Sequence, residues 1–316
     1  MSPPKQIQMD THVFTKKDLI SLKPKHDLFV GIDSDGCVFP TMEIKQKKCL
    51  HNLIVSHWRL EKIEKYVRES AEFVNLYSIH RGRNRFPCLL LSIDLIRNRP
   101  EVIASKANLP EFKSLKRFIG SGVPLSNAEL EKAVNSSGDK ELSSILKWSQ
   151  AANELIAKTV KNVEPFKWVR ESLQKIKENA DAICVSQTPN EALVREWDEH
   201  NLMGFVRVIA GQELGTKGEH IHMVTEGCYD SDKILIIGDA PGDREAALDN
   251  HAHFYPINPG HESDSWERFY KESFLRFIDG KYYGSYEQEI TKEFQALLPS
   301  LPPWKKPEPY STKGLP

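Results

Sequence analysis

The sequence predicts an α/β protein with a Rossmann-like parallel sheet and an inserted α-helical domain. Three observations predict this fold. Short apolar runs of strand length recur along the chain, amphipathic stretches separate them in the second half, and a long stretch of purely helical character lies between the first run and the second. The predicted strands are Leu28–Ile32, Ala182–Ser186, Phe205–Ala210, Ile234–Ile237 and His253–Ile257.

The first predicted strand follows an N-terminal extension, residues 1–26, whose opening "MSPPKQIQMD" lacks the apolar core of a signal peptide. Stretches such as "ELSSILKWSQAANELIAKTV" place apolar residues at helical spacing and predict an inserted helical domain over residues 43–162. The sheet domain is expected to comprise residues 27–42 and 163–298. Residues 299–316 are rich in proline and are expected to form an extended, disordered tail.

The composition argues against nucleic acid and membranes as partners. The 316 residues contain 43 Lys+Arg and 44 Asp+Glu, so the formal net charge is −1 and nothing favours nucleic acid or a membrane surface as a partner. No run approaches the roughly 18 apolar residues that cross a bilayer. The five cysteines show no CxxC spacing, which is typical of reduced thiols in a cytoplasmic protein. The oligomeric state stays open.

Polar residues follow four of the predicted strands directly. Because the carboxyl ends of parallel strands meet at one edge of the sheet, we expect these side chains to lie close together. Thr188 and Glu191 could form a capping box with Pro189 at the helix start, and Thr216 and Glu219 could form a second one. The candidate site residues are Asp33, Asp35, Ser186, Lys217, Asp239 and Asp243.

Four converging carboxylates require a hard divalent cation, and Mg²⁺ prefers carboxylate oxygens, water and a substrate phosphate. Lys217 lies at a helix start, where the helix dipole disfavours a cation, so an anion in front of it is expected. Ser186 and Lys217 would hold phosphate oxygens. One carboxylate can attack phosphorus, while a second one two residues away protonates the leaving oxygen and later deprotonates water.

The motifs "DSDGC", "VSQT", "GTK" and "GDAPGD", in this order, resemble the four motifs of the haloacid-dehalogenase-like (HAD) hydrolase superfamily. The resemblance covers residues 28–41 and about 164–260. It implies strand order 5-4-1-2-3, a helical type 1 cap, and an Mg²⁺-dependent phosphatase that acts on a small phosphorylated metabolite. One departure is Cys37, where the family usually has threonine.

The resemblance also implies a role for each site residue. Asp33 would be the nucleophile and Asp35 the general acid/base. Ser186, with its neighbour Gln187, and Lys217 would bind phosphate. Asp33, the backbone carbonyl of Asp35, and Asp239 would hold Mg²⁺, with Asp243 as a further ligand or a neighbour of the ligands.

A basic cluster in the helical insertion, "HRGRNRF", suggests a role in substrate specificity. Arg81, Arg83 and Arg85 could bind anionic groups of the substrate, whereas the alternative is a solvated turn between two helices. Two other functions stay open for the whole chain: a phosphomutase that uses the same aspartyl-phosphate, and a catalytically inactive phosphate sensor. Asp35 argues against a dehalogenase, because dehalogenases with a similar core lack the second aspartate.

Overall fold

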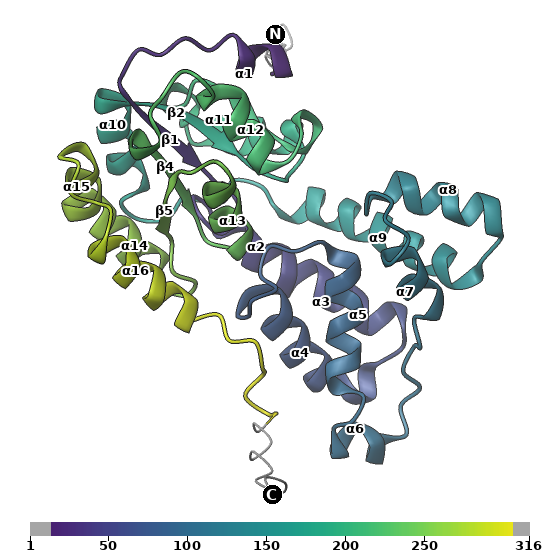
Figure 1. Ribbon diagram of the computed structural model, residues 1–316. Coiled ribbons are helices and arrows are strands. Elements are labelled where there is room, and N and C mark those ends of the chain that lie inside the picture. Colours follow the sequence, from purple (N-terminus) through teal and green to yellow (C-terminus); the bar gives the residue numbers. More distant parts are fainter. Residues whose placement is uncertain (1–13, 306–316) are drawn as a thin grey trace, which may run out of the picture. The chain divides into compact units, whose positions relative to one another are not determined.

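The computed structural model describes residues 14–305 and contains a five-stranded, all-parallel sheet (Figure 1). The strand order is β3-β2-β1-β4-β5, which confirms the predicted order. In the central register, Val30 of β1 pairs with Ala182 of β2 on one side and with Leu235 of β4 on the other. The strands are β1 (Leu28–Ile32), β2 (Ala180–Val185), β3 (Ile209–Ala210), β4 (Ile234–Gly238) and β5 (His253–Pro256).

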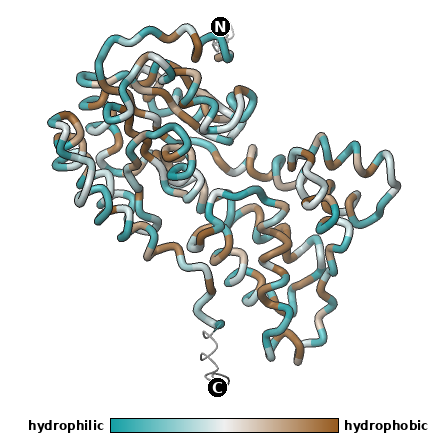
Figure 2. Tube along the Cα trace, viewed as in Figure 1, coloured by the Kyte–Doolittle hydropathy of each residue, from teal (hydrophilic) through white to brown (hydrophobic). Residues whose placement is uncertain are grey.

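Every residue of β2 and β4 is buried. Because successive strand residues point to opposite faces, helices must cover both faces of the sheet, as is usual for parallel sheets. Figure 2 shows the hydrophobic residues gathered on the strands of this unit. The predicted strand at residues 205–210 is shorter in the structure: Phe205 ends a 3₁₀ turn, and only Ile209–Ala210 forms β3.

The chain divides into two compact units, and the sheet unit comprises Met1–Thr41 and Lys161–Lys292. One hydrophobic core joins the strands to the surrounding helices, with Trp197 and Trp266 among its largest buried side chains. The helices of this unit are α1 (Lys16–Ile20), α10 (Val169–Asn179), α11 (Asn190–Glu199), α12 (Lys217–Thr225), α13 (Pro241–Asp249), α14 (Glu262–Arg268), α15 (Phe274–Ile278) and most of α16 (Ser285–Ala296).

The second unit is helical and comprises Met42–Val160 together with Glu293–Pro316. Its main part is inserted between β1 and β2, as the sequence predicts, and it has a separate core in which Trp58 packs on Trp148 and Phe112. After α2 (Thr41–Ile44) and a π-helical turn, the helices are α3 (His51–His57), α4 (Glu64–Leu76), α5 (Arg85–Ile96), α6 (Pro100–Ser105), α7 (Lys113–Ile119), α8 (Asn127–Ser137) and α9 (Lys140–Thr159).

The C-terminal segment packs on the helical unit as far as the structure describes it. The Pro299 carbonyl accepts a hydrogen bond from the Ile79 amide, and the Trp304 ring meets Phe73 at 5.8 Å between centroids. The expectation of a disordered tail is therefore wrong for residues 299–305, because Trp304 finds an apolar surface; residues 306–316 lie outside the described part. Among residues 14–305, no helix combines the length and hydrophobicity that a bilayer span requires.

Candidate active site

The loop after β1 is held rigidly from several sides. The Asp33 amide continues the sheet by donating to the Ile237 carbonyl at 2.9 Å, and Gly36 takes a positive φ of 79° that suits glycine. The indole of Trp197 donates to the Ser34 hydroxyl at 3.0 Å, and that of Trp266 donates to the Cys37 carbonyl at 2.8 Å. The loop that carries Asp33 and Asp35 is thus fixed by distant helices, a role that the helical pattern around Trp197 did not reveal.

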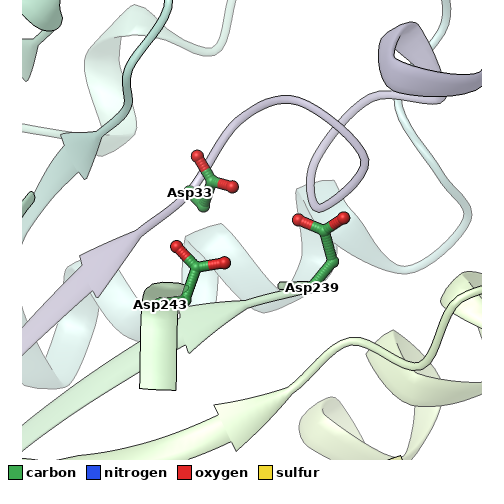
Figure 3. A group of neighbouring side chains, drawn as sticks. All are labelled: Asp33, Asp239 and Asp243. Atoms are coloured by element: carbon green, nitrogen blue, oxygen red, sulfur yellow. The ribbon is translucent and has the colours of Figure 1, made fainter. Parts of the chain in front are cut away.

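Three buried aspartates converge at the carboxyl end of the sheet (Figure 3). Asp33 follows β1, Asp239 follows β4, and Asp243 lies in the first turn of α13. One carboxylate oxygen from each lies within 4.8 Å of the others. Gly238 makes this possible, because a Cβ there would lie 2.2 Å from Cγ of Asp243. The structure therefore brings together three of the four predicted metal-ligating aspartates.

Lys217 joins this cluster from the start of α12. Its Nζ lies 2.9 Å from Oδ2 of Asp33 and 2.5 Å from Oδ1 of Asp243. The predicted capping box between Thr216 and Glu219 is present and fixes the helix start. These carboxylates are the anions that a lysine at this end of a helix requires.

The electrostatics of the cluster follow from its burial. Burial raises the pKa of Asp33 well above its ordinary value; Lys217 opposes this shift, and Asp243 and Asp239 add to it. Burial on its own would lower the pKa of Lys217, but Asp243 and Asp33 outweigh it and raise that pKa. Lys217 thus lies between the carboxylates of Asp33 and Asp243, and Asp239 completes the cluster of three acidic side chains.

Asp35 is held differently. Its Oδ1 accepts a short hydrogen bond from the Thr41 hydroxyl, and its Oδ2 accepts one from the Thr188 hydroxyl at 2.5 Å. The predicted capping box at Thr188 and Glu191 is wrong: α11 begins later, at Asn190, and the Thr188 hydroxyl is used by Asp35 instead. Sequence analysis missed both threonines as site residues. The signal of Thr188 was weak, because a threonine before Pro-Asn also suits a helix start.

Ser186 and Gln187 follow β2. Ser186 is buried, its amide donates to the Ala210 carbonyl at 2.9 Å, and its hydroxyl accepts from the Thr188 amide at 3.2 Å. The side chain of Gln187 is exposed and donates to the Gly215 carbonyl at 3.1 Å. Ser186 thus lies at the same edge of the sheet as Asp33, which is the next residue after the neighbouring strand.

The basic cluster lies in the helical unit, and its three arginines have different surroundings. Arg81 is buried and donates to the Leu76 carbonyl, whereas Arg83 is exposed. The guanidinium of Arg85 donates to the carbonyl and hydroxyl of Ser149 and to the side chain of Asn153. Arg81 and Arg85 thus contribute to packing within the helical unit, and the specificity role of the cluster remains a prediction.

The donor set of the aspartate cluster fits Mg²⁺. All three side chains offer oxygen ligands, which a hard cation prefers over nitrogen or sulfur. They converge from rigid positions, two just after strands and one in the first turn of a helix whose Ala240 amide donates to Asp243 at 3.0 Å. Asp33, Asp239 and Asp243 are therefore the residues that could hold the ion through their side chains.

The similarity of this chain to known proteins lies in its structure. No family model and no curated protein matches the sequence. Among solved structures, the chain is similar to a haloacid dehalogenase-like hydrolase from Streptococcus pneumoniae, with a TM-score of 0.41, 14% identity, and coverage of 85% of this chain and 98% of that one.

Two further matches are HAD-superfamily hydrolases. One, of subfamily IA from Geobacter sulfurreducens, has a TM-score of 0.37 and 14% identity over 73% of this chain and 88% of that one. The other, from Ehrlichia chaffeensis, has a TM-score of 0.36 and 14% identity over 75% of this chain and 89% of that one. Because these TM-scores lie below 0.5, we infer function from the strand order and the contacts of the site.

Proposed function

We propose that this chain is a cytoplasmic, Mg²⁺-dependent phosphatase that hydrolyses a small phosphorylated metabolite through an aspartyl-phosphate. The observation that carries the proposal is the convergence of Asp33, Asp239 and Asp243 with Lys217 at the carboxyl end of a parallel sheet. Carboxylates and a lysine around one point match what a phosphate ester needs: a nucleophile, a metal site and a cation for its oxygens.

Each residue has a distinct role in the proposed reaction. A carboxylate oxygen of Asp33 attacks phosphorus, the bond from phosphorus to the ester oxygen breaks, and Asp35 gives its proton to the departing oxygen. Water then attacks the phosphorus of the aspartyl-phosphate, Asp35 takes a proton from that water, and Asp33 leaves as a free carboxylate with release of inorganic phosphate. Two steps with a positioned acid and base replace one difficult displacement.

The other residues bind the phosphoryl group. Lys217, Ser186 and Gln187 would hold its non-bridging oxygens, and the contacts of Lys217 place its ammonium beside the nucleophile. Asp33, Asp239 and Asp243, with the carbonyl of Asp35, would hold Mg²⁺. When bound, the ion offsets the negative charge that otherwise repels a phosphate ester from a carboxylate nucleophile.

Substrate choice is assigned to the inserted helical unit, which we propose acts as the cap, with residues 43–162 as its extent. Arg83 is the arginine of the basic cluster whose side chain is exposed, and it is the one best suited to contact an anionic group of a substrate.

The proposal is tested by removing the nucleophile. Asp33→Asn should lower turnover of para-nitrophenyl phosphate in the presence of Mg²⁺ by about 10⁴-fold or more, a scale typical for loss of a catalytic nucleophile. A panel of metabolite phosphates, assayed by released inorganic phosphate, would identify the substrate class. Mass spectrometry of acid-quenched protein should detect one phosphoryl group on the wild type and none on Asp33→Asn.

Asp27→Asn is the matched control. Asp27 lies at the opposite end of β1 from Asp33, its side chain is exposed, and the substitution makes the same chemical change. It should leave turnover unchanged, and circular dichroism should show that both variants fold. Near wild-type turnover by Asp33→Asn would exclude Asp33 as the nucleophile, and a wild-type protein inactive on every ester would exclude the phosphatase.

A further inference from the structure

Two threonine hydroxyls donate hydrogen bonds to the carboxylate of Asp35, one to each oxygen. Thr41 donates to Oδ1 and Thr188 donates to Oδ2, so each oxygen receives one hydroxyl. A carboxylate has about four lone-pair directions, and these two hydroxyls use one on each oxygen. The terminal torsion of an aspartate is otherwise broad, and two donors on opposite oxygens restrict it.

Thr41 and Thr188 are themselves well fixed. Thr41 is fully buried and is the first residue of α2. Thr188 lies in the loop after β2, where its carbonyl accepts from the Gln212 amide at 3.1 Å and its amide donates to Ser186 Oγ at 3.2 Å. Threonine is stiff at χ1, so a fixed backbone also fixes where its hydroxyl points.

The loop that carries Thr188 fits closely against its neighbour. A Cβ at Gly211 would lie 2.6 Å from the Thr188 carbonyl oxygen, so the two segments approach as closely as a glycine permits. The Asn190 side chain accepts from the Gly211 amide at 2.6 Å, and Glu213 accepts from the Asn190 amide at 2.9 Å. Because other groups bond the start of α11, the Thr188 hydroxyl is available for Asp35.

We propose that Thr41 and Thr188 are positioning residues that aim the Asp35 carboxyl group at the leaving-group oxygen. The inference rests on the proposed phosphatase function. A general acid must come within about 2.6–3.2 Å of the oxygen that it protonates, so a freely rotating carboxyl group transfers its proton less effectively. Attack by Asp33 does not depend on these hydroxyls. Their loss therefore affects esters whose leaving group needs a proton more than esters whose leaving group does not.

Two substrates of similar shape make this testable. Para-nitrophenolate leaves readily without a proton, whereas phenolate needs one, so para-nitrophenyl phosphate and phenyl phosphate separate attack from leaving-group protonation. Thr188→Val removes the hydroxyl and keeps the shape. It should lower kcat/KM for phenyl phosphate about tenfold, a part of the 10²–10⁴ that acid–base catalysis supplies, and change kcat/KM for para-nitrophenyl phosphate less than about threefold. We compare kcat/KM because it reports the step in which the leaving group departs, whereas kcat also includes the attack of water, which Asp35 assists for both esters.

Thr188→Ser restores the hydroxyl and should return kcat/KM for phenyl phosphate to within about threefold of wild type. Thr41→Val and Thr41→Ser repeat the test from the other oxygen; because Thr41 is fully buried, the half-buried Thr188 decides the matter if Thr41→Val fails to fold. Thr225→Val is the matched control, since this buried threonine donates to the Ile221 carbonyl at 2.9 Å, and it should show no dependence on leaving group.

Equal losses of kcat/KM on the two esters, or no recovery in Thr188→Ser, would overturn the positioning role and assign the threonines to structure alone. Failure of the proposed function looks different. In that case the wild type hydrolyses neither ester, or Asp33→Asn keeps its activity on both, whatever the threonine variants do.

Discussion

Asp33 and Asp181 are both buried aspartates of adjacent strands in one sheet, yet their surroundings are opposite. Asp33 follows the carboxyl end of β1, where it shares Lys217 with Asp243 and lies close to Asp239. Asp181 lies near the amino end of β2, paired with Phe29, and has donors on every side. Asp33 has two neighbouring carboxylates besides its ion pair with Lys217, whereas Asp181 is held by hydrogen-bond donors.

The donors of Asp181 come from three separate segments. Its carboxylate accepts from the amides of Lys25 and His26 at 2.7 and 2.9 Å, from the Arg207 guanidinium at 2.6 Å and from the Tyr229 hydroxyl at 2.9 Å. Burial alone would raise the pKa of Asp181, but these donors outweigh burial and lower it. At Asp33 the balance is reversed, and the pKa is raised.

The difference distinguishes a structural carboxylate from a functional one. A buried charge whose donors compensate it contributes to stability, and one that is under-neutralised costs stability unless a ligand supplies the missing charge. Asp181 therefore joins the chain before β1 to the sheet, and in the proposed function Asp33 binds a cation and attacks phosphorus. The comparison makes distinct predictions for stability at the two ends of the sheet.

Asp181→Asn should give the largest change in stability. The amide cannot accept from all four donors, and hydrogen bonds to a charged group are worth about 1.5–3 kcal/mol each, so we expect a loss of about 3 kcal/mol in the free energy of unfolding at pH 7. Because the folded pKa of Asp181 lies below its unfolded value of about 3.9, its contribution is complete above that pH.

The same contribution is lost as the pH falls through the folded pKa. The stability difference between wild type and Asp181→Asn should therefore be constant from about pH 5 to pH 7 and shrink below about pH 4, measured by urea unfolding followed by circular dichroism. Asp27→Asn, an exposed control from the same unit, should show no difference. Equal stability of wild type and Asp181→Asn at pH 7 would contradict the assigned role.

The sequence predicts the sheet well because its strands are buried on both faces. Such strands appear as continuous apolar runs between polar segments, so the bounds of β1 agree with the prediction and those of β4 differ by one residue. The carboxyl-end rule then places Asp33 and Asp239 together, although the chain between them is long. The 3₁₀ turn at Met203–Phe205 was not predictable, because its apolar residues also suit a strand.

Contacts between side chains were harder to predict. Thr188 had a plausible local partner at a helix start, and only the tertiary position of Asp35 shows that its hydroxyl is used elsewhere. Asp181 gave no signal, because its donors come from residues distant in sequence. Arg81, Arg83 and Arg85 look alike in "HRGRNRF", and only the folded helical unit shows that Arg81 is buried and Arg83 exposed.

Arg85 and Arg83 allow the same comparison for positively charged side chains, between one with hydrogen-bond partners in the protein and one that is exposed. Arg85→Met should lower the free energy of unfolding by about 2 kcal/mol, because its guanidinium donates to Ser149 and Asn153 and these acceptors would lose a charged donor. Arg83→Met, the exposed matched control, should leave stability within about 0.5 kcal/mol of wild type.

The two arginine variants should also differ in activity, and here Arg83→Met is the one expected to change. If Arg83 contacts an anionic group of the substrate, Arg83→Met should raise KM about tenfold for the best ester of the panel, as expected for loss of one charged contact. An unchanged KM would remove Arg83 from substrate binding, and equal stability of Arg85→Met and Arg83→Met would contradict the structural assignment of Arg85.

Apart from the control variants, Mg²⁺ should give the smallest change in stability, and it tests the cluster of Asp33, Asp239 and Asp243 directly. An ion that binds only the folded protein stabilises it by about 1.4 kcal/mol at ten times its dissociation constant. We therefore expect Mg²⁺ to raise the unfolding midpoint of wild type, and a chelator to reverse the rise. Asp239→Asn removes one of the three ligands and should abolish the effect, whereas Asp181→Asn should keep it despite its lower stability. A rise of the same size in Asp239→Asn would place the ion elsewhere, and the carboxylate cluster would then need another source of positive charge.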